Sequence, residues 1–226
     1  RVMFAFARAE GCVDSNPADD LGSALLAPPR AQPHPALTEE DECRKLFAQF
    51  VHLRARPETI AAAQFLALTA VRLDAVRGMR WDEFDIGRQV WTVPAARMKL
   101  IRANKGDDRF DHLVPISDQA LNVLFSNPSM CGEQQLVFPG RDGRPIGAGV
   151  LRELHRRTDF AGRHVPHGWR ASFSTILNED LGPEWSRDID AALGHAVKGK
   201  VEGAYNRSTM LDRRRGLFDR WGELLA

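Results

Sequence analysis

Apolar residues recur at three- and four-residue spacing along most of this chain, which is the period of an amphipathic helix. A first clear example begins at Thr38, a suitable N-cap followed by acidic residues, and continues through Leu46, Phe50 and Val51. Pro57 then suits the first turn of a strongly apolar helix that runs to Thr69. The same period predicts further helices over residues 117–125, 148–157, 167–179, 183–193 and 209–225, and the end of one over residues 2–11.

Two short segments instead alternate between apolar and polar positions. Gln89–Val93 reads QVWTV and His112–Ile116 reads HLVPI. Alternation with period two is typical of strands that have one buried face. We therefore predict a mainly α fold with a small antiparallel β-sheet, of the α+β class.

The N-terminal part of the chain differs in composition from the rest. Residues 13–37 are rich in Pro, Ala, Asp and Ser, with prolines at 28, 29, 33 and 35. Such a composition is typical of a linker or an extended segment. We predict one main compact domain that begins at about residue 37. The chain starts with Arg1 rather than Met, and we expect further sequence upstream.

Composition limits the function classes. A chain with 43% hydrophobic and 27% charged residues is ordinary for a soluble globular protein. No apolar run approaches the roughly 20 residues that a membrane span needs, and no signal pattern opens the chain. Cys12, Cys43 and Cys131 are odd in number and form no CxxC pair, so we expect plain thiols in a reducing compartment rather than disulfides or a zinc site.

The net charge of the chain gives little information about its function. A value of +1 does not identify a nucleic-acid-binding protein, because neutralising phosphates needs local rather than global positive charge. Local positive charge does gather between the two predicted strands, at Arg97, Lys99, Arg102, Lys105 and Arg109. We expect a basic loop there.

Several residues near the C-terminus are candidates for chemistry. Tyr205 is the only tyrosine in the chain. His167 and Arg170 stand three apart at the start of a predicted helix and so share one face, and His195 precedes Tyr205 by ten residues. Each residue taken alone is more typical of packing, capping or a solvated surface than of catalysis.

Two earlier residues change that balance. Arg72 lies where the apolar helix gives way to a turn, which is an unfavourable place for a guanidinium unless an anion meets it. Lys99 follows the first predicted strand and has a side chain long enough to reach a bound backbone. The whole set supplies cations, a proton donor and a nucleophile, and it lacks a carboxylate cluster for a metal. It therefore predicts phosphoryl transfer without a metal or another cofactor.

The order of these residues resembles the tyrosine recombinase family, especially the integrases of prophages and genomic islands. The resemblance covers about residues 37–226 and five motifs in sequence. FLALTAVRLDAVRGMRWDEFD resembles the first arginine motif, WTVPAARMK with HLVPIS the lysine-bearing hairpin, VFPG the mid-domain turn, VPHGWRASFSTI the HxxR helix, and LGHAVKGKVEGAYNR the closing histidine and tyrosine. Residues 1–36 resemble the end of the core-binding domain and its linker, and residues 37–226 the catalytic domain.

The resemblance implies a role for each candidate. Tyr205 would attack a DNA phosphodiester, form a 3′-phosphotyrosyl link and free a 5′-hydroxyl. Arg72 and Arg170 would clamp the scissile phosphate, and Lys99 would protonate the leaving oxygen. His167 would act as acid or base toward the tyrosine, and His195 would hydrogen-bond the phosphate.

Two departures from the family pattern leave alternatives open. The first motif usually carries an acidic residue three positions after its arginine, where this chain has Ala75, with Asp74 one place early. A weakened integrase remnant that binds DNA without cutting it is therefore one alternative, and a type IB topoisomerase is a less favoured one. The long hairpin also leaves Lys105 as an alternative proton donor to Lys99.

The resemblance further implies partners and a location. We expect the protein to bind double-stranded DNA at attachment sites, as a homotetramer on DNA and a monomer when free. We expect it in the bacterial cytoplasm, and on the nucleoid when it is bound to DNA.

The last helix carries an apolar stripe that includes Leu217, Phe218 and Trp221. This stripe fits either a neighbouring copy or, as is more common, the protein's own core.

Overall fold

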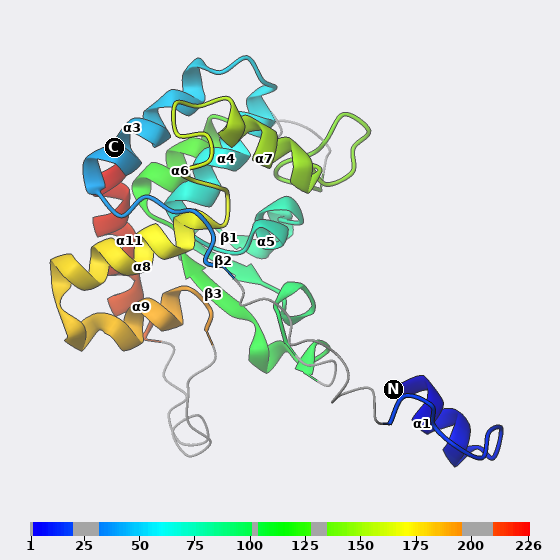
Figure 1. Cartoon of the computed structure of the whole chain (residues 1–226). Coiled ribbons are helices and arrows are strands. Elements are labelled where there is room, and N and C mark those ends of the chain that lie inside the picture. The colour runs from blue at the N-terminus through cyan, green and yellow to red at the C-terminus, as the bar shows by residue number, and fades with distance from the viewer. Residues whose placement is uncertain (1, 20–31, 101–103, 128–134, 196–209) are drawn as a thin grey trace. The chain divides into compact units, whose positions relative to one another are not determined.

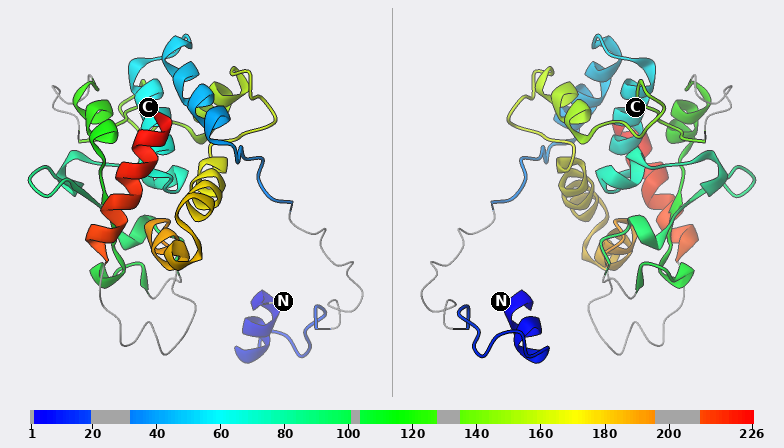
Figure 2. Two further views of the ribbon diagram at one scale, coloured as in Figure 1. Left: turned by 90° about the vertical axis from the view of Figure 1, so that its left-hand side faces the viewer. Right: turned by 90° about the vertical axis from the view of Figure 1, so that its right-hand side faces the viewer.

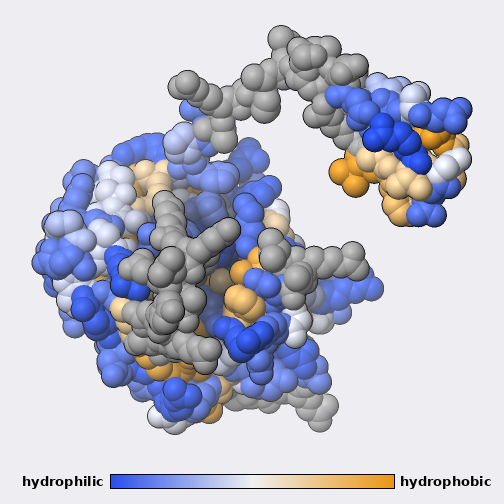
Figure 3. All heavy atoms as spheres, turned by 90° about the horizontal axis from the view of Figure 1, so that it is seen from below, coloured by the Kyte–Doolittle hydropathy of each residue, from blue (hydrophilic) through white to orange (hydrophobic). Residues whose placement is uncertain are grey.

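The structure is a computed structural model that describes residues 2–19, 32–100, 104–127, 135–195 and 210–226. Its contacts divide the chain into two units, Arg1–Pro33 and His34–Ala226. The smaller unit contains the helix α1 (Val2–Ala9), and apolar side chains of α1, such as Val2, Met3 and Phe6, are exposed (Figure 3). The larger unit contains all the other helices and strands of the described chain.

Helices form most of the larger unit (Figure 1). In chain order the α-helices are α3 (Glu40–Gln49), α4 (Pro57–Thr69), α5 (Leu73–Arg77), α6 (Asp118–Phe125), α7 (Ala148–Arg156), α8 (Gly168–Leu181), α9 (Ser186–Ala192) and α11 (Leu211–Leu225). Short 3₁₀ helices are η1 (Phe50–His52), η2 (Trp81–Glu83), η3 (Ala95–Arg97), η5 (Asp108–Phe110) and η7 (Pro183–Trp185). The helix α4 is buried on nearly all sides, which agrees with its strongly apolar sequence.

A three-stranded antiparallel sheet lies at one side of these helices, in the order β1 (Phe84–Asp85), β2 (Val90–Val93) and β3 (His112–Pro115). The register places Trp91 opposite Val114 on one side and opposite Phe84 on the other. Trp91 and Val114 are completely buried, and Phe84 is nearly so. The sheet is therefore fixed to the helices through its apolar face.

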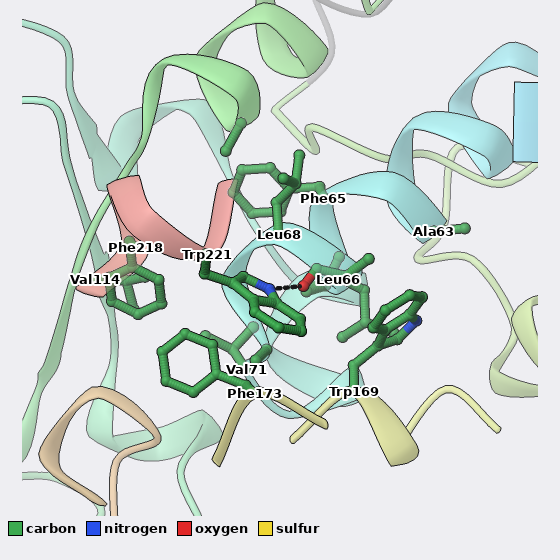
Figure 4. Packing of buried hydrophobic residues seen from close by; sticks show 14 of the residues in the cluster. Ala63, Phe65, Leu66, Leu68, Val71, Val114, Trp169, Phe173, Phe218 and Trp221 are labelled. Atoms are coloured by element: carbon green, nitrogen blue, oxygen red, sulfur yellow. Dashed lines mark hydrogen bonds between the residues drawn. The ribbon is translucent and has the colours of Figure 1, made fainter. Parts of the chain in front are cut away.

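The C-terminal helix α11 packs against the core of its own unit. It contacts α3, α4, α6, α9 and β3, and in the left view of Figure 2 it crosses the side of the unit that faces the viewer. Trp221 is fully buried, and its indole N–H donates to the carbonyl of Ala67 in α4 at 2.8 Å, the dashed line in Figure 4. Trp169 and Phe173 from α8 surround the same indole. The apolar stripe of α11 is thus covered within this chain.

The mainly α fold with a small antiparallel sheet is confirmed, with three local differences from the sequence prediction. Neither α5 nor β1 was predicted, because five and two residues are too short to show a period. The helix predicted over residues 183–193 is divided into η7 and α9. Pro183 begins the 3₁₀ turn after Gly182, whose φ of 89° ends α8.

Two of the three cysteines lie within the described residues. Cys12 is exposed and Cys43 is buried, both as free thiols, whereas Cys131 lies outside the described residues. Within the described ranges, no group of three or more histidine, cysteine or acidic side chains is arranged to hold a metal. None of the helices described has the length and apolar character needed to cross a bilayer.

Three histidines are buried in the larger unit as neutral rings. His155 donates from Nδ1 to the carbonyl of Leu151 at 2.8 Å and accepts from the indole N–H of Trp169 at 3.2 Å, so both of its nitrogens are satisfied without a charge. His112 donates to the carbonyl of Ala192 at 3.1 Å. Burial lowers the pKa of His112 to about 3, that of His155 to about 4 and that of His164 to about 3.

We predict that the free energy of unfolding falls as the pH drops below about 6.5. The three rings bind a proton near pH 6.5 when unfolded but only near pH 3 to 4 when folded, so acid favours the unfolded chain. At pH 5 the loss is up to about 2 kcal/mol for each ring. Urea titrations at pH 7 and pH 5, followed by tryptophan fluorescence, measure it, because all five tryptophans belong to the larger unit.

Two variants sharpen this measurement. His52 is exposed, and His52→Ala should retain the full pH dependence. His155→Gln removes one buried titrating group and should lose roughly a third of it. Equal stability of the parent at the two pH values would contradict the assignment of these rings as buried and neutral.

Candidate active site

A cleft of about 580 Å³ lies beside α5, α7 and α8. Five of the six residues predicted from sequence line it: Arg72, Lys99, His167, Arg170 and His195. The other lining residues are His34, Leu73, Asp74, Ala148, Arg152, Val165 and Pro166. A larger cavity of about 750 Å³, beside the 140–147 turn and the start of α4, contains none of the predicted residues. The chemistry-bearing side chains are thus brought together in the smaller of the two.

Arg72 reaches this cleft because the chain turns sharply after α4. Ala70 caps α4 in the left-handed region, with a φ of 46°, and Arg72 then stands in an extended conformation at the N-cap of α5. Its guanidinium is partly buried, and burial lowers its pKa. No hydrogen bond or ion pair to it is found among the described residues. A desolvated, unneutralised cation in a cleft favours an anionic ligand.

Arg170 lies on the first turn of α8 and is 6% exposed. Its guanidinium donates to the carbonyls of Ala70, at 3.0 Å, and Leu193, at 2.8 Å. Burial and the nearby charge of Arg72 lower its pKa to about 10, so it remains a cation. The two guanidiniums therefore lie close enough for the charge of Arg72 to lower the pKa of Arg170, and the two carbonyls that accept from Arg170 carry no charge.

His195 connects Arg170 to a carboxylate. Nη2 of Arg170 donates to Nε2 of His195 at 2.9 Å, and a guanidinium has no acceptor, so Nε2 carries the lone pair. The ring proton is then on Nδ1, which donates to Asp190 Oδ1 at 2.8 Å. The chain from Asp190 through His195 to Arg170 thus specifies one tautomer of the imidazole. In this arrangement His195 orients the arginine, and its ring has no further N–H to offer a phosphate.

His167 stands at the N-cap of α8 and is exposed to the cleft. Burial by the cleft walls lowers its pKa, and the charges of Arg170, His34, Arg72 and His195 lower it further. The ring is therefore neutral near pH 7 and has a lone pair available to accept a proton.

Lys99 follows η3 on the segment between β2 and β3, and its exposed side chain lines the cleft. Lys105 is also exposed but is not among the lining residues. The expected basic loop is partly neutralised, because Arg97 pairs with Glu83 and Arg109 pairs with Asp107 at 2.6 Å. Arg102 lies outside the described residues. Of the basic residues described in this loop, Lys99 is the one that reaches the cleft.

The position of the missing acidic residue is now clear. Ala75 is 1% exposed, and its carbonyl accepts a long hydrogen bond of 3.5 Å from Arg97. Asp74 lines the cleft, yet its carboxylate pairs with Arg77 at 2.6 Å. Neither residue gives Arg72 a carboxylate partner in this structure.

Tyr205 lies outside the described residues, together with the rest of 196–209. Its neighbours on both sides are fixed to the larger unit. His195 bonds to Asp190 and Arg170 at one end, and Arg213 at the other end pairs with buried Asp188 at 2.7 Å.

Comparison with known proteins then decides the family. The model of the phage integrase family matches residues 37–211. This chain belongs to the phage integrase family.

Over the aligned regions, relatives in this family are identical to the chain at about a third of the positions. It is similar to prophage integrase IntA of Escherichia coli strain K12, with 32% identity over 99% of the chain and 52% of that protein. It is 31% identical to the integrase of Shigella phage Sf6, over 99% of the chain and 56% of that protein. The chain thus spans about half the length of the relatives it matches.

Solved structures of integrases share the fold. The Tn1549 transposon integrase, in complex with a circular intermediate DNA, matches with a TM-score of 0.59 over 96% of this chain and 75% of that one, at 16% identity. The integrase of mycobacterium phage Brujita matches with a TM-score of 0.57 over 100% of this chain and 74% of that one, at 18% identity. At these identities the likeness shows the fold alone.

The sequence of this phage integrase family member did not reveal two side chains that line the cleft, His34 and Arg152, or Asp190, which bonds to the lining residue His195. Asp190 looks like an ordinary surface carboxylate, and only its hydrogen bond to His195 distinguishes it. His34 stands in the proline-rich segment that was predicted as a linker, and Arg152 on α7 resembles a solvated helix residue. The signal for Asp190 is weak but present, since it precedes the family's closing histidine by five residues at the end of a helix.

We predict that Asp190 selects the tautomer of His195. In the parent chain, the proton should reside on Nδ1, with Nε2 unprotonated. An exposed pair of this kind is worth up to about 1 kcal/mol, which corresponds to about a five-fold bias, so Asp190→Ala should make the two tautomers more equal. Nitrogen-15 spectra of the histidine rings at pH 8 measure the populations.

The matched control for this test is Asp212→Ala, which removes an exposed carboxylate from the first turn of α11. This variant should leave the His195 signals unchanged. A proton found mainly on Nε2 of the parent would show that the chain from Asp190 to Arg170 is not formed.

Proposed function

We propose that this chain is the catalytic part of a site-specific DNA recombinase of the tyrosine type, which integrates and excises a mobile element. The observation that carries the proposal is the meeting of Arg72, Arg170, His167 and Lys99 in one cleft. These residues come from parts of the chain about a hundred positions apart, in a member of the phage integrase family. DNA is the proposed substrate, and the solved integrases with this fold include complexes with DNA.

The two arginines bind the scissile phosphate. Arg170 donates three of its five N–H groups to Ala70, Leu193 and His195, and these hydrogen bonds fix the plane of its guanidinium. Its remaining donors and the guanidinium of Arg72 are directed to the phosphate oxygens. Both cations are already desolvated, so they stabilise the additional negative charge of the transition state without reorganising.

The covalent step transfers the phosphoryl group from DNA to the protein. The phenolic oxygen of Tyr205 forms a bond to phosphorus, and the bond from phosphorus to the 5′-oxygen breaks. His167, neutral at pH 7, accepts the phenolic proton, and Lys99 donates a proton to the leaving 5′-oxygen. The phosphodiester energy is kept in the 3′-phosphotyrosyl link, so the reverse attack by a 5′-hydroxyl rejoins the strand without a cofactor.

The wider organisation is proposed on the same basis. Residues 1–36 form the end of the core-binding domain and its linker, and residues 37–226 form the catalytic domain. The protein acts as a homotetramer on double-stranded attachment sites and is a monomer when free, in the bacterial cytoplasm and on the nucleoid when bound. The burial of α11 within its own unit supports a stable free monomer.

One observation favours a second function. With Ala75 buried and Asp74 paired to Arg77, none of the carboxylates in the described ranges pairs with Arg72. A remnant that binds DNA without cutting it fits this feature. Formation of a covalent adduct with DNA distinguishes an active recombinase from such a remnant.

We predict that the chain forms a covalent adduct with DNA through Tyr205. The chain, with any sequence that its gene adds at either end, is incubated with nicked suicide duplexes from the flanks of the element that encodes it. We expect an adduct that survives SDS, forms in the presence of EDTA, and disappears in Tyr205→Phe. Duplex binding without an adduct in the parent would favour the remnant and make Ala75 the first position to restore to Glu.

We further predict that Lys99 rather than Lys105 is the proton donor. Lys99→Ala should lower the cleavage rate by about 10² to 10⁴-fold, because general acid catalysis contributes that much. A duplex with sulfur in place of the 5′-bridging oxygen should restore cleavage, since a thiolate leaves without protonation. Lys105→Ala should cleave both duplexes at the parent rate, and the opposite pattern would assign the donor to Lys105.

A further inference from the structure

The segment that leads into the larger unit is fastened to the first turn of α8. Leu37 is buried, and its carbonyl accepts from the hydroxyl of Ser172 at 2.5 Å. The carbonyl of Pro35 lies so close to Gly168 that a Cβ on this glycine would stand 2.5 Å from it. Pro33 and Pro35 also restrict the backbone on both sides of His34. The backbone that carries His34 is therefore held on its C-terminal side by the contacts of Pro35 and Leu37.

His34 contacts His167 directly. The two ring centroids are 4.7 Å apart with an interplanar angle of 70°, an edge-to-face arrangement. His34 also lines the cleft. His167 is exposed at the N-cap of α8 and makes no side-chain capping bond, and no hydrogen bond to its ring is found among the described residues. Among the described residues, His34 provides the one aromatic ring that contacts the ring of His167.

Charged and titratable groups surround this pair of histidines in the cleft. The titratable and charged groups that face it across the cleft are Arg72, Asp74, Lys99, Arg152, Arg170 and His195. They are mainly cationic, and a further positive charge on His34 opposes protonation of His167. His34 therefore affects both the orientation and the protonation of its neighbour.

We propose that His34, from the segment before the catalytic fold, is a positioning residue that holds the imidazole of His167 in the orientation that proton transfer requires. The proposal rests on the proposed recombinase function. His34 acts through His167 and not on the substrate itself. A histidine that must accept a proton gains from a fixed orientation, because a small misplacement of a reacting group is costly in rate.

Strand cleavage is the first measurement. His34→Ala should lower the single-turnover rate of adduct formation about 10-fold, with the dissociation constant for the duplex unchanged. His34→Phe keeps an aromatic edge against His167 and should recover most of that rate above pH 7. Gln32→Ala, two positions earlier and exposed, is the matched control and should behave as the parent.

The pH dependence separates positioning from a merely structural role. His34→Phe removes one of the charges that oppose protonation of His167, so the acid limb of its pH–rate profile should move to higher pH than in the parent. A fold defect would lower the rate at every pH without moving the limb. Equal rates in the parent and His34→Ala, or no recovery in His34→Phe, would overturn the proposal.

A measurement without DNA distinguishes failure of this proposal from failure of the proposed function. Proton NMR of the histidine rings follows the titration of His167, which is identified as the signal lost in His167→Gln. The midpoint for His167 should rise in both His34→Ala and His34→Phe. A shifted titration with no adduct in any protein would retain the contact and reject the recombinase chemistry, whereas an unshifted titration would reject the contact.

Discussion

The guanidinium of Arg170 joins three parts of the chain that are far apart in sequence. It bonds to the carbonyl that ends α4, to the carbonyl that follows α9 and to the ring of His195, while its own backbone belongs to α8. A buried cation needs such partners, because its desolvation is costly unless its donors are satisfied. The corner that presents Arg72 and the turn that presents His195 therefore both depend on one side chain. These hydrogen bonds hold together the segments of the chain that form the walls of the cleft.

The turn at His195 shows how tightly this arrangement is packed. Gly194 has a φ of 64°, and a Cβ there would lie 2.8 Å from Met98 and 3.3 Å from the ring of His112. His112 in turn bonds to the carbonyl of Ala192. The β3 strand, the hairpin segment near Lys99 and the end of α9 thus meet at a glycine that no other residue replaces without strain. In the segment LGH, the glycine is therefore required by packing, and the histidine that follows it bonds to Arg170.

Much of this architecture could be predicted from the sequence, and the failures have physical causes. Helices such as α4 and α8 are long enough for apolar spacing to be visible, and β2 and β3 alternate clearly. The short elements α5 and β1 are formed by tertiary contacts and leave no period. Arg72, Arg170 and His195 could be selected because their motifs are specific. Asp190 and His34 could not, because their significance lies in single contacts that only the folded chain makes.

The contact between Pro35 and Gly168 bears on where such a protein is divided for laboratory work. The family pattern begins at residue 37, and the compact unit begins at His34. A fragment cut at the family boundary would retain every helix and strand of the larger unit, and it would still lose the carbonyl that packs on the first turn of α8. Truncations chosen from family boundaries can therefore produce a well-folded protein whose reactive centre has been altered at its edge, and three additional residues are enough to avoid it.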